Sequence, residues 1–177
     1  AMRLKKHKAT RRALRFFTVR HGFHAPFKVI LDGTLLHASL EAGQQDVEAA
    51  VGKLLGDRVR VFVTQCIREE IRGLGPDFAQ TLRASRGFPC HKCGHAGQGL
   101  SAAACIADVV GEANRARFFV ATNDGAVRAG LNRVAAAPVI FRTPNGLQLQ
   151  APSEAQRQRA GGAAERAEAR RLREVQA

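Results

Sequence analysis

Long apolar runs and acidic residues are both scarce in this sequence. No apolar stretch among the 177 residues approaches the roughly 20 residues that a helix needs to cross a bilayer, so we expect no membrane partner. The charged N-terminal segment is not followed by an apolar segment, which argues against a secretory signal peptide. Only 15 Asp and Glu stand against 28 Lys and Arg, giving a formal net charge of +13. This excess predicts a polyanionic partner, and nucleic acid is the most common one.

Cysteine is also scarce. The chain has 4 cysteines, and three of them lie between Cys90 and Cys105. This clustering is unlike the spacing of a disulfide framework, and without a secretory signal we expect a reducing compartment. Metal binding therefore explains these cysteines better than disulfide bonding does.

Residues 2–27 form a basic N-terminal arm that contains no Asp or Glu. A block of charge of one sign repels itself and usually becomes ordered only on a partner. Four phenylalanines are interleaved with the charges; they could stack on bases, but we expect packing anchors for the folded domain. The RNA-binding residues predicted here and in the later cysteine-rich segment are Lys5, Lys6, Lys8, Arg11, Arg12, Arg15 and Lys92.

The middle of the chain, residues 28–150, alternates between strand and helix patterns. Apolar or β-branched runs predict strands at 28–31, 59–64, 118–122, 139–142 and 147–150. Helical spacing and caps predict helices at 47–55, 66–72, 76–86, 101–114 and 125–132. Strands separated by helices predict an α/β fold with three layers and a mainly parallel sheet, ending in a hairpin-like edge. Residues 151–177 predict a charged, weakly attached helix capped by Ser153.

Three acidic residues are expected at one rim of this sheet. Asp32 and Asp124 follow predicted strands, and Glu70 lies one turn into the helix after the second strand. In an open parallel sheet, ligands gather at the carboxyl ends of the strands. A carboxylate cluster there would suit Mg²⁺ or Mn²⁺ and metal-assisted phosphodiester hydrolysis. Taken singly, each aspartate is more readily explained as a helix cap.

The sequence segments around these acids resemble those of the PIN-domain nuclease family over about residues 28–143. More narrowly, the chain resembles the eukaryotic rRNA-processing family known as U-three-protein twenty-three, a component of the small-subunit processome. The segments that carry this resemblance are Lys5–Lys8, Phe16-Phe17, Pro26–Thr34, Gly73–Gly75, the cysteine cluster and Phe118–Thr122. The resemblance implies a PIN-like domain over 28–150, a nucleolar location, and an H/ACA small nucleolar RNA, pre-rRNA and processome proteins as partners.

One departure from the PIN pattern bears on activity. Active PIN nucleases carry a further essential Asp at the start of the helix that precedes the 118–122 strand, where this chain has Ser-Ala-Ala-Ala-Cys at 101–105. Asp108 lies about one turn later, roughly 6 Å along the helix axis. A metal-binding carboxylate can be displaced from its productive position by only about 0.5 Å. We therefore predict weak Mg²⁺ or Mn²⁺ binding and absent or vestigial cleavage. An active Mg²⁺- or Mn²⁺-dependent endoribonuclease and a scaffold that binds acidic proteins remain the alternatives.

The segment 87–105 is predicted to be a zinc-binding insertion. The spacing C-x2-C-x-H-x9-C predicts a closed structural zinc site made by Cys90, Cys93, His95 and Cys105. His91 competes with His95 for the third position. Cys66 lies apart in the sequence and is expected to be a small buried hydrophobe. The resembling family carries a CCHC zinc motif here, with a longer gap between its first two cysteines.

Overall fold

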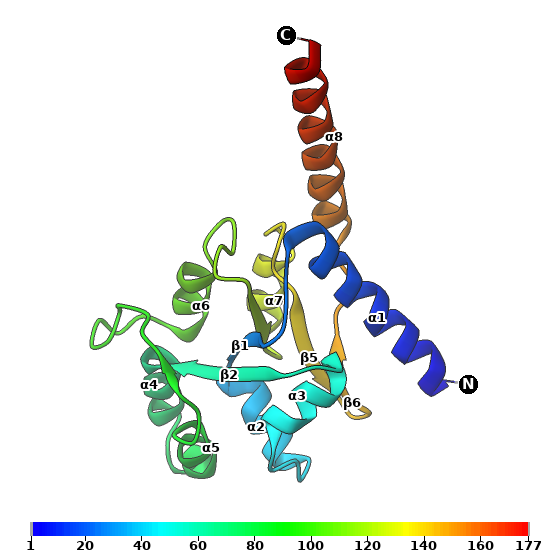
Figure 1. Ribbon diagram of the computed structural model, residues 1–177. Helices are drawn as coiled ribbons and strands as arrows, with labels where there is room; N and C mark the ends of the chain where they lie inside the picture. The colour runs from blue at the N-terminus through cyan, green and yellow to red at the C-terminus, as the bar shows by residue number, and fades with distance from the viewer. Residues whose placement is uncertain (1, 177) are drawn as a thin grey trace.

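The computed structural model describes residues 2–176 and has an α/β architecture around one sheet (Figure 1). Its six strands have the order β3-β2-β1-β4-β5-β6. All neighbours are parallel except β5 and β6, which pair in antiparallel fashion. The predicted α/β fold with a mainly parallel sheet is therefore confirmed. The strands are β1 (Phe27–Leu31), β2 (Val59–Thr64), β3 (Cys90–His91), β4 (Phe118–Ala121), β5 (Val139–Thr143) and β6 (Gly146–Leu149).

Helices cover both faces of the sheet. Side chains of α1, α2 and α3 join one apolar cluster, and those of α4, α6 and α7 join the other. In β1, Val29 and Leu31 face the first cluster while Ile30 faces the second, and all three are fully buried. The helices are α1 (Met2–His21), α2 (Gly33–Glu41), α3 (Val47–Leu55), α4 (Gln65–Gly73), η1 (Pro76–Phe78), α5 (Ala79–Ser85), α6 (Ala102–Val110), α7 (Gly125–Leu131) and α8 (Glu154–Gln176).

The basic arm is helical and docked on the domain. Ala13 and Phe17 of α1 are buried, and the Phe17 ring lies edge-on to Phe23, which in turn meets Phe119 of β4. This aromatic packing docks the carboxyl-terminal half of α1 on the domain, although the charge pattern suggested ordering only on a partner. The phenylalanines act as packing anchors, as expected.

Two elements differ from the expectation drawn from the sequence. The segment after Asp32 is a helix, α2, which was not among the helices predicted from spacing and caps. Gly33 permits this helix to approach α4, because a Cβ at that position would lie 2.8 Å from Ile71 Cγ1. The second element is β3, a two-residue strand in the Gly- and Cys-rich segment that had no strand pattern.

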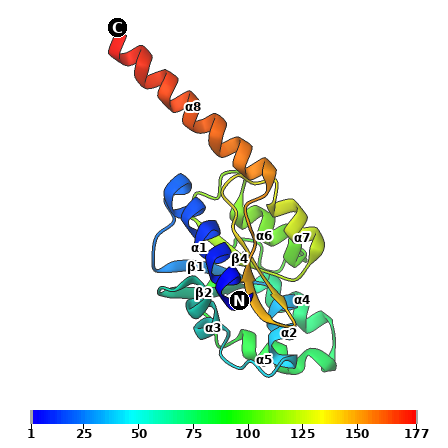
Figure 2. The same cartoon turned by 90° about the vertical axis from the view of Figure 1, so that its right-hand side faces the viewer.

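The C-terminal helix α8 extends away from the domain in both views (Figure 1 and Figure 2). Its first turn anchors it: Gln156 is 2% exposed and its side-chain amide donates to the carbonyls of Leu131, Val134 and Ala137. Residues 163–175 are exposed. Within residues 2–176, neither this helix nor any other is long and apolar enough to cross a membrane.

Candidate metal centre and acidic rim

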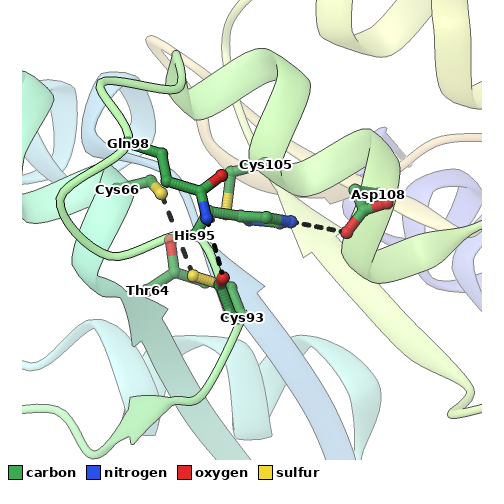
Figure 3. A network of polar contacts seen from close by, with 8 residues as sticks. Thr64, Cys66, Cys93, His95, Gln98, Cys105 and Asp108 are labelled. Carbon is green, nitrogen blue, oxygen red and sulfur yellow. Dashed lines mark hydrogen bonds and ion pairs between the residues drawn. The ribbon is translucent and has the colours of Figure 1, made fainter.

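Three cysteines and one histidine converge beside the carboxyl end of β2. The ligand atoms of Cys66, Cys93, His95 and Cys105 all lie within 4.8 Å of one another (Figure 3). Cys66 is on the first turn of α4, Cys93 and His95 are in the segment after β3, and Cys105 is on α6. We call these four residues the CCHC cluster. It joins two helices to a segment that has little apolar core of its own.

The structure replaces one predicted ligand. Cys90 was expected in the cluster, but it is exposed, and its thiol lies 3.7 Å from the His91 carbonyl oxygen. Cys90 and His91 are held in β3 by pairing with Val63 and Thr64, and His91 turns toward Phe62 and Phe118 instead. Neither residue belongs to the cluster.

Cys66 takes the fourth position because β2 and β3 are neighbours. The α4 helix begins directly after β2, so its first turn faces the segment that leaves β3. Cys66 is buried, as predicted, but the expectation that it lies apart from the other cysteines was wrong. The long first gap of the CCHC motif in the resembling family was the signal that pointed to it, since 26 residues separate Cys66 from Cys93.

The donor set fits a zinc ion. Three sulfurs and one imidazole nitrogen are the ligands of a closed structural site, and a tetrahedron with bonds of about 2.3 Å has edges of about 3.8 Å. The sulfurs of Cys66 and Cys93 are 3.8 Å apart. His95 Nε2 lies 2.6 Å from Asp108 Oδ2, while Nδ1 is buried without a hydrogen-bond partner. A carboxylate on the outer nitrogen of a histidine is the usual support for a metal-binding ring.

The thiols differ in how readily they ionise. Burial opposes ionisation of Cys93, but hydrogen bonds from the His95 backbone and from the Cys105 and Cys66 thiols lower its pKa to about 7. Burial raises the pKa of Cys66 and of Cys105. A bound cation would stabilise all three thiolates, because zinc binds cysteine in its deprotonated form.

At the acidic rim, Asp32 and Asp124 are neighbours in different roles. Asp32 is 2% exposed, and its Oδ2 accepts hydrogen bonds from Thr34 Oγ1 at 2.8 Å and Thr122 Oγ1 at 2.7 Å. Its side chain does not cap α2. Asp124 does cap α7, accepting from the backbone N–H groups of Ala126 at 2.8 Å and Val127 at 3.1 Å. Burial, with a smaller contribution from the Asp124 charge, raises the pKa of Asp32 despite its hydrogen bonds.

Glu70 and Asp108 each form a hydrogen bond that involves α6. Glu70 Oε1 accepts a hydrogen bond from the backbone N–H of Ala102 at 3.3 Å, at the start of α6. Asp108 on the same helix bonds His95, as described above. Ala103 and Ala104, at the position where the resemblance implies a further acid in active PIN nucleases, are exposed. Among residues 2–176, the CCHC cluster is the only group of three or more closely spaced metal-ligating side chains.

The predicted RNA-binding cations are all exposed. Lys5, Lys8, Arg12 and Arg15 recur at intervals of three or four residues along α1, on the side opposite the buried Phe17. We call the six exposed cations of α1 that were predicted to bind RNA the α1 stripe; it comprises Lys5, Lys6, Lys8, Arg11, Arg12 and Arg15. Lys92 is exposed between β3 and Cys93.

Comparison with known proteins agrees with this architecture. The rRNA-processing protein utp23 of Schizosaccharomyces pombe is 28% identical over 156 residues, which cover 87% of this chain and 60% of that protein. The solved structure of the PIN domain endonuclease Utp24 superposes with a TM-score of 0.65 at 21% identity, covering 72% of this chain and 94% of that one. These matches confirm the predicted PIN-like fold and the resemblance to the rRNA-processing family. The Fcf1 family model matches residues 53–151, more than half of the sequence, and the chain therefore belongs to the Fcf1 family.

Proposed function

We propose that this chain is an RNA-binding ribosome-assembly factor that acts in early small-subunit pre-rRNA processing through a degenerate, inactive PIN-type domain. The name of the S. pombe relative assigns rRNA processing to that protein, and the net charge of +13 supports an RNA partner here. The proposed ligands are an H/ACA small nucleolar RNA and pre-rRNA. The proposed setting is the nucleolus, among small-subunit processome proteins.

One contact carries the proposal that the domain does not cleave RNA. Asp108, the acid closest in sequence to the missing position on α6, lies 2.6 Å from His95 and so supports the CCHC cluster instead of the rim. The rim then retains Asp32, buried between two threonine hydroxyls, and Asp124, whose carboxylate caps α7. Metal-assisted hydrolysis needs carboxylates free to hold Mg²⁺ or Mn²⁺ between them. Tight binding of either ion is not expected.

The CCHC cluster is proposed to hold one structural zinc ion. Cys66 would anchor it to α4, Cys105 to α6, and Cys93 and His95 would fix the segment after β3. Structural zinc contributes on the order of 10 kcal/mol to folding in zinc-finger peptides. Such an ion would order the segment that carries Lys92.

RNA binding is proposed to depend on the α1 stripe. Its six cations are exposed along one 20-residue helix, with no acidic residue in its first turn. Each lysine or arginine that neutralises a phosphate releases condensed counterions, which drives binding in a salt-dependent way. Lys92 adds one further cation near the CCHC cluster.

Incubation of the full chain with end-labelled single-stranded RNA in Mg²⁺ or Mn²⁺ tests the proposal. We expect the RNA to be bound and to stay intact, in the wild type and in Asp32→Asn alike. Asp77→Asn, which removes an exposed acid in η1, is the matched control. The adjacency of Asp32 and Asp124 favours one alternative, an active endoribonuclease. Mn²⁺-dependent cleavage that disappears only in Asp32→Asn would support that alternative.

A further inference from the structure

A second group of cations lies on the face of the sheet opposite the one that α1 covers. On the face covered by α4, α6 and α7, Lys28 of β1 pairs with Arg60 of β2 on one side and Phe118 of β4 on the other. Two residues further along, Ile30 and Val120 are fully buried beneath the helices. At the amino end of the strands this cover is incomplete: Lys28 is half-buried and Arg60 is exposed.

Three aromatic rings lie among these cations. The His91 ring from β3 is 5.0 Å from the Phe118 ring and 6.5 Å from the Phe62 ring, and all three meet edge to face. Lys28 Nζ is 4.9 Å from the centre of the Phe118 ring, and Arg60 Cζ is 5.4 Å from that of Phe62. Phe118 is buried, whereas Phe62 and His91 remain half-buried. We call Lys28, Arg60, Phe62, His91 and Phe118 the aromatic platform.

The charges of the platform are not neutralised by acids. In the part of the chain that the structure describes, neither Lys28 nor Arg60 forms an ion pair with Asp or Glu. A cation over a ring often serves packing alone, and is then worth about 0.5–1 kcal/mol at an exposed site. Two unpaired cations beside two partly accessible rings match the chemistry of a single-stranded nucleic-acid site, where bases stack and phosphates meet basic side chains.

The platform adjoins the end of the arm. Lys28 follows α1 and its connecting segment in the chain, and Arg117, just before Phe118, donates from Nε to the His21 carbonyl at 3.1 Å. The carboxyl end of α1 therefore lies beside the amino edge of β4. This places the platform close to one end of the surface proposed to bind RNA.

We infer that the aromatic platform binds one unpaired RNA nucleotide, whose base stacks on Phe62 and meets the His91 ring at its edge, while Lys28 and Arg60 contact its flanking phosphates. The inference rests on the proposed RNA-binding function and extends it from the phosphate backbone to a base. The recognition is independent of base identity, because every base offers a flat π face. An acidic protein partner would engage the two cations without needing the rings.

Binding of a short single-stranded RNA and of an abasic strand of the same length to the full chain tests this inference. Phe62→Leu keeps an apolar side chain but removes the ring, so binding of the base-bearing strand should weaken about fivefold or more, while binding of the abasic strand is unchanged. Arg60→Gln should reduce the salt slope for both strands by about 0.7. His91→Gln, checked for retained zinc, should repeat the effect of Phe62→Leu without altering the apolar core.

Phe141→Leu provides a matched control, since Phe141 is a half-buried ring on β5 with the Arg128 guanidinium 4.1 Å above it. It should bind both strands as the wild type does. If the wild type does not distinguish the two strands, or if Phe62→Leu and His91→Gln both bind the base-bearing strand normally, the platform does not bind a base. If the wild type binds neither strand, the proposed RNA-binding function fails, and this inference fails with it.

Discussion

At the scale of single residues, two carboxylates with similar places in the sequence have different environments. Asp32 and Asp124 both follow a strand and precede a helix. Asp124 accepts two backbone hydrogen bonds as a cap, whereas Asp32 is enclosed by the hydroxyls of Thr34 and Thr122. Spacing alone could not separate these roles, because the difference depends on Thr122, which is 90 residues away from Asp32.

The buried Asp32 predicts a particular dependence of stability on pH. Its pKa is raised above the ordinary value of 3.8 mainly by burial, so between that value and the raised pKa the folded state binds more protons than the unfolded state. Its contribution to stability is therefore full below about pH 4 and is lost as the pH rises through the raised pKa. Asp32→Asn, which resembles the protonated form, should be more stable than the wild type at neutral pH and should flatten this dependence.

Urea denaturation from pH 4 to pH 8 measures this effect. Asp77→Asn controls for the removal of a negative charge at an exposed site. If the free energy of unfolding changes with pH in the same way for the wild type and Asp32→Asn, the buried carboxyl does not titrate as we expect.

Two cysteine substitutions separate the observed cluster from the predicted one. Cys66→Ser removes a cluster ligand and should lower the zinc content from about one ion per chain to well below it, with loosening of residues 87–105. Cys90→Ser changes an exposed thiol outside the cluster and should retain the zinc. Elemental analysis of protein purified without chelator gives the stoichiometry. Zinc retained in Cys66→Ser and lost in Cys90→Ser would instead favour the ligand set expected from spacing.

At the scale of elements, the strands and helices that depend on local periodicity could be predicted from the sequence. The central strands β1, β2 and β4 are mostly apolar because most of their residues are buried or half-buried on both faces, and the amphipathic pattern of α3 matches its packing. The fourth cluster ligand was missed because it comes from α4, which only the pairing of β2 with β3 brings to the later cysteines. Three of the four cluster residues followed from spacing within one segment, and the fourth required the sheet order.

The attachment of α8 gives a prediction at this scale. Gln156→Ala should lower the free energy of unfolding by about 1–3 kcal/mol, since it leaves buried carbonyls without their donor. The unpartnered groups would be the carbonyls of Leu131, Val134 and Ala137. Gln158→Ala, on the exposed side of the same helix, should change the free energy of unfolding by less than about 0.5 kcal/mol. Equal effects in chemical denaturation would mean that α8 is not anchored through Gln156.

At the scale of the whole molecule, charge is concentrated on elements that flank the core. The α1 helix lies along the domain with its cations exposed, and α8 projects from it with most of its length exposed (Figure 2). The acidic rim is small by comparison and is partly occupied by capping and hydroxyl contacts. In the proposed function, a polyanion would bind on this periphery, with the PIN-type sheet serving as the support.

The salt dependence of RNA affinity tests this arrangement most directly. Log affinity for single-stranded RNA should fall with log salt at about −0.7 per phosphate contacted. Replacing Lys5, Lys6, Lys8, Arg11 and Arg12 by Ala should reduce the magnitude of the slope by about 2–4, whereas Asp32→Asn should leave it unchanged. A five-site variant that binds RNA with the affinity and salt slope of the wild type would contradict the account, because the binding surface would then not be α1.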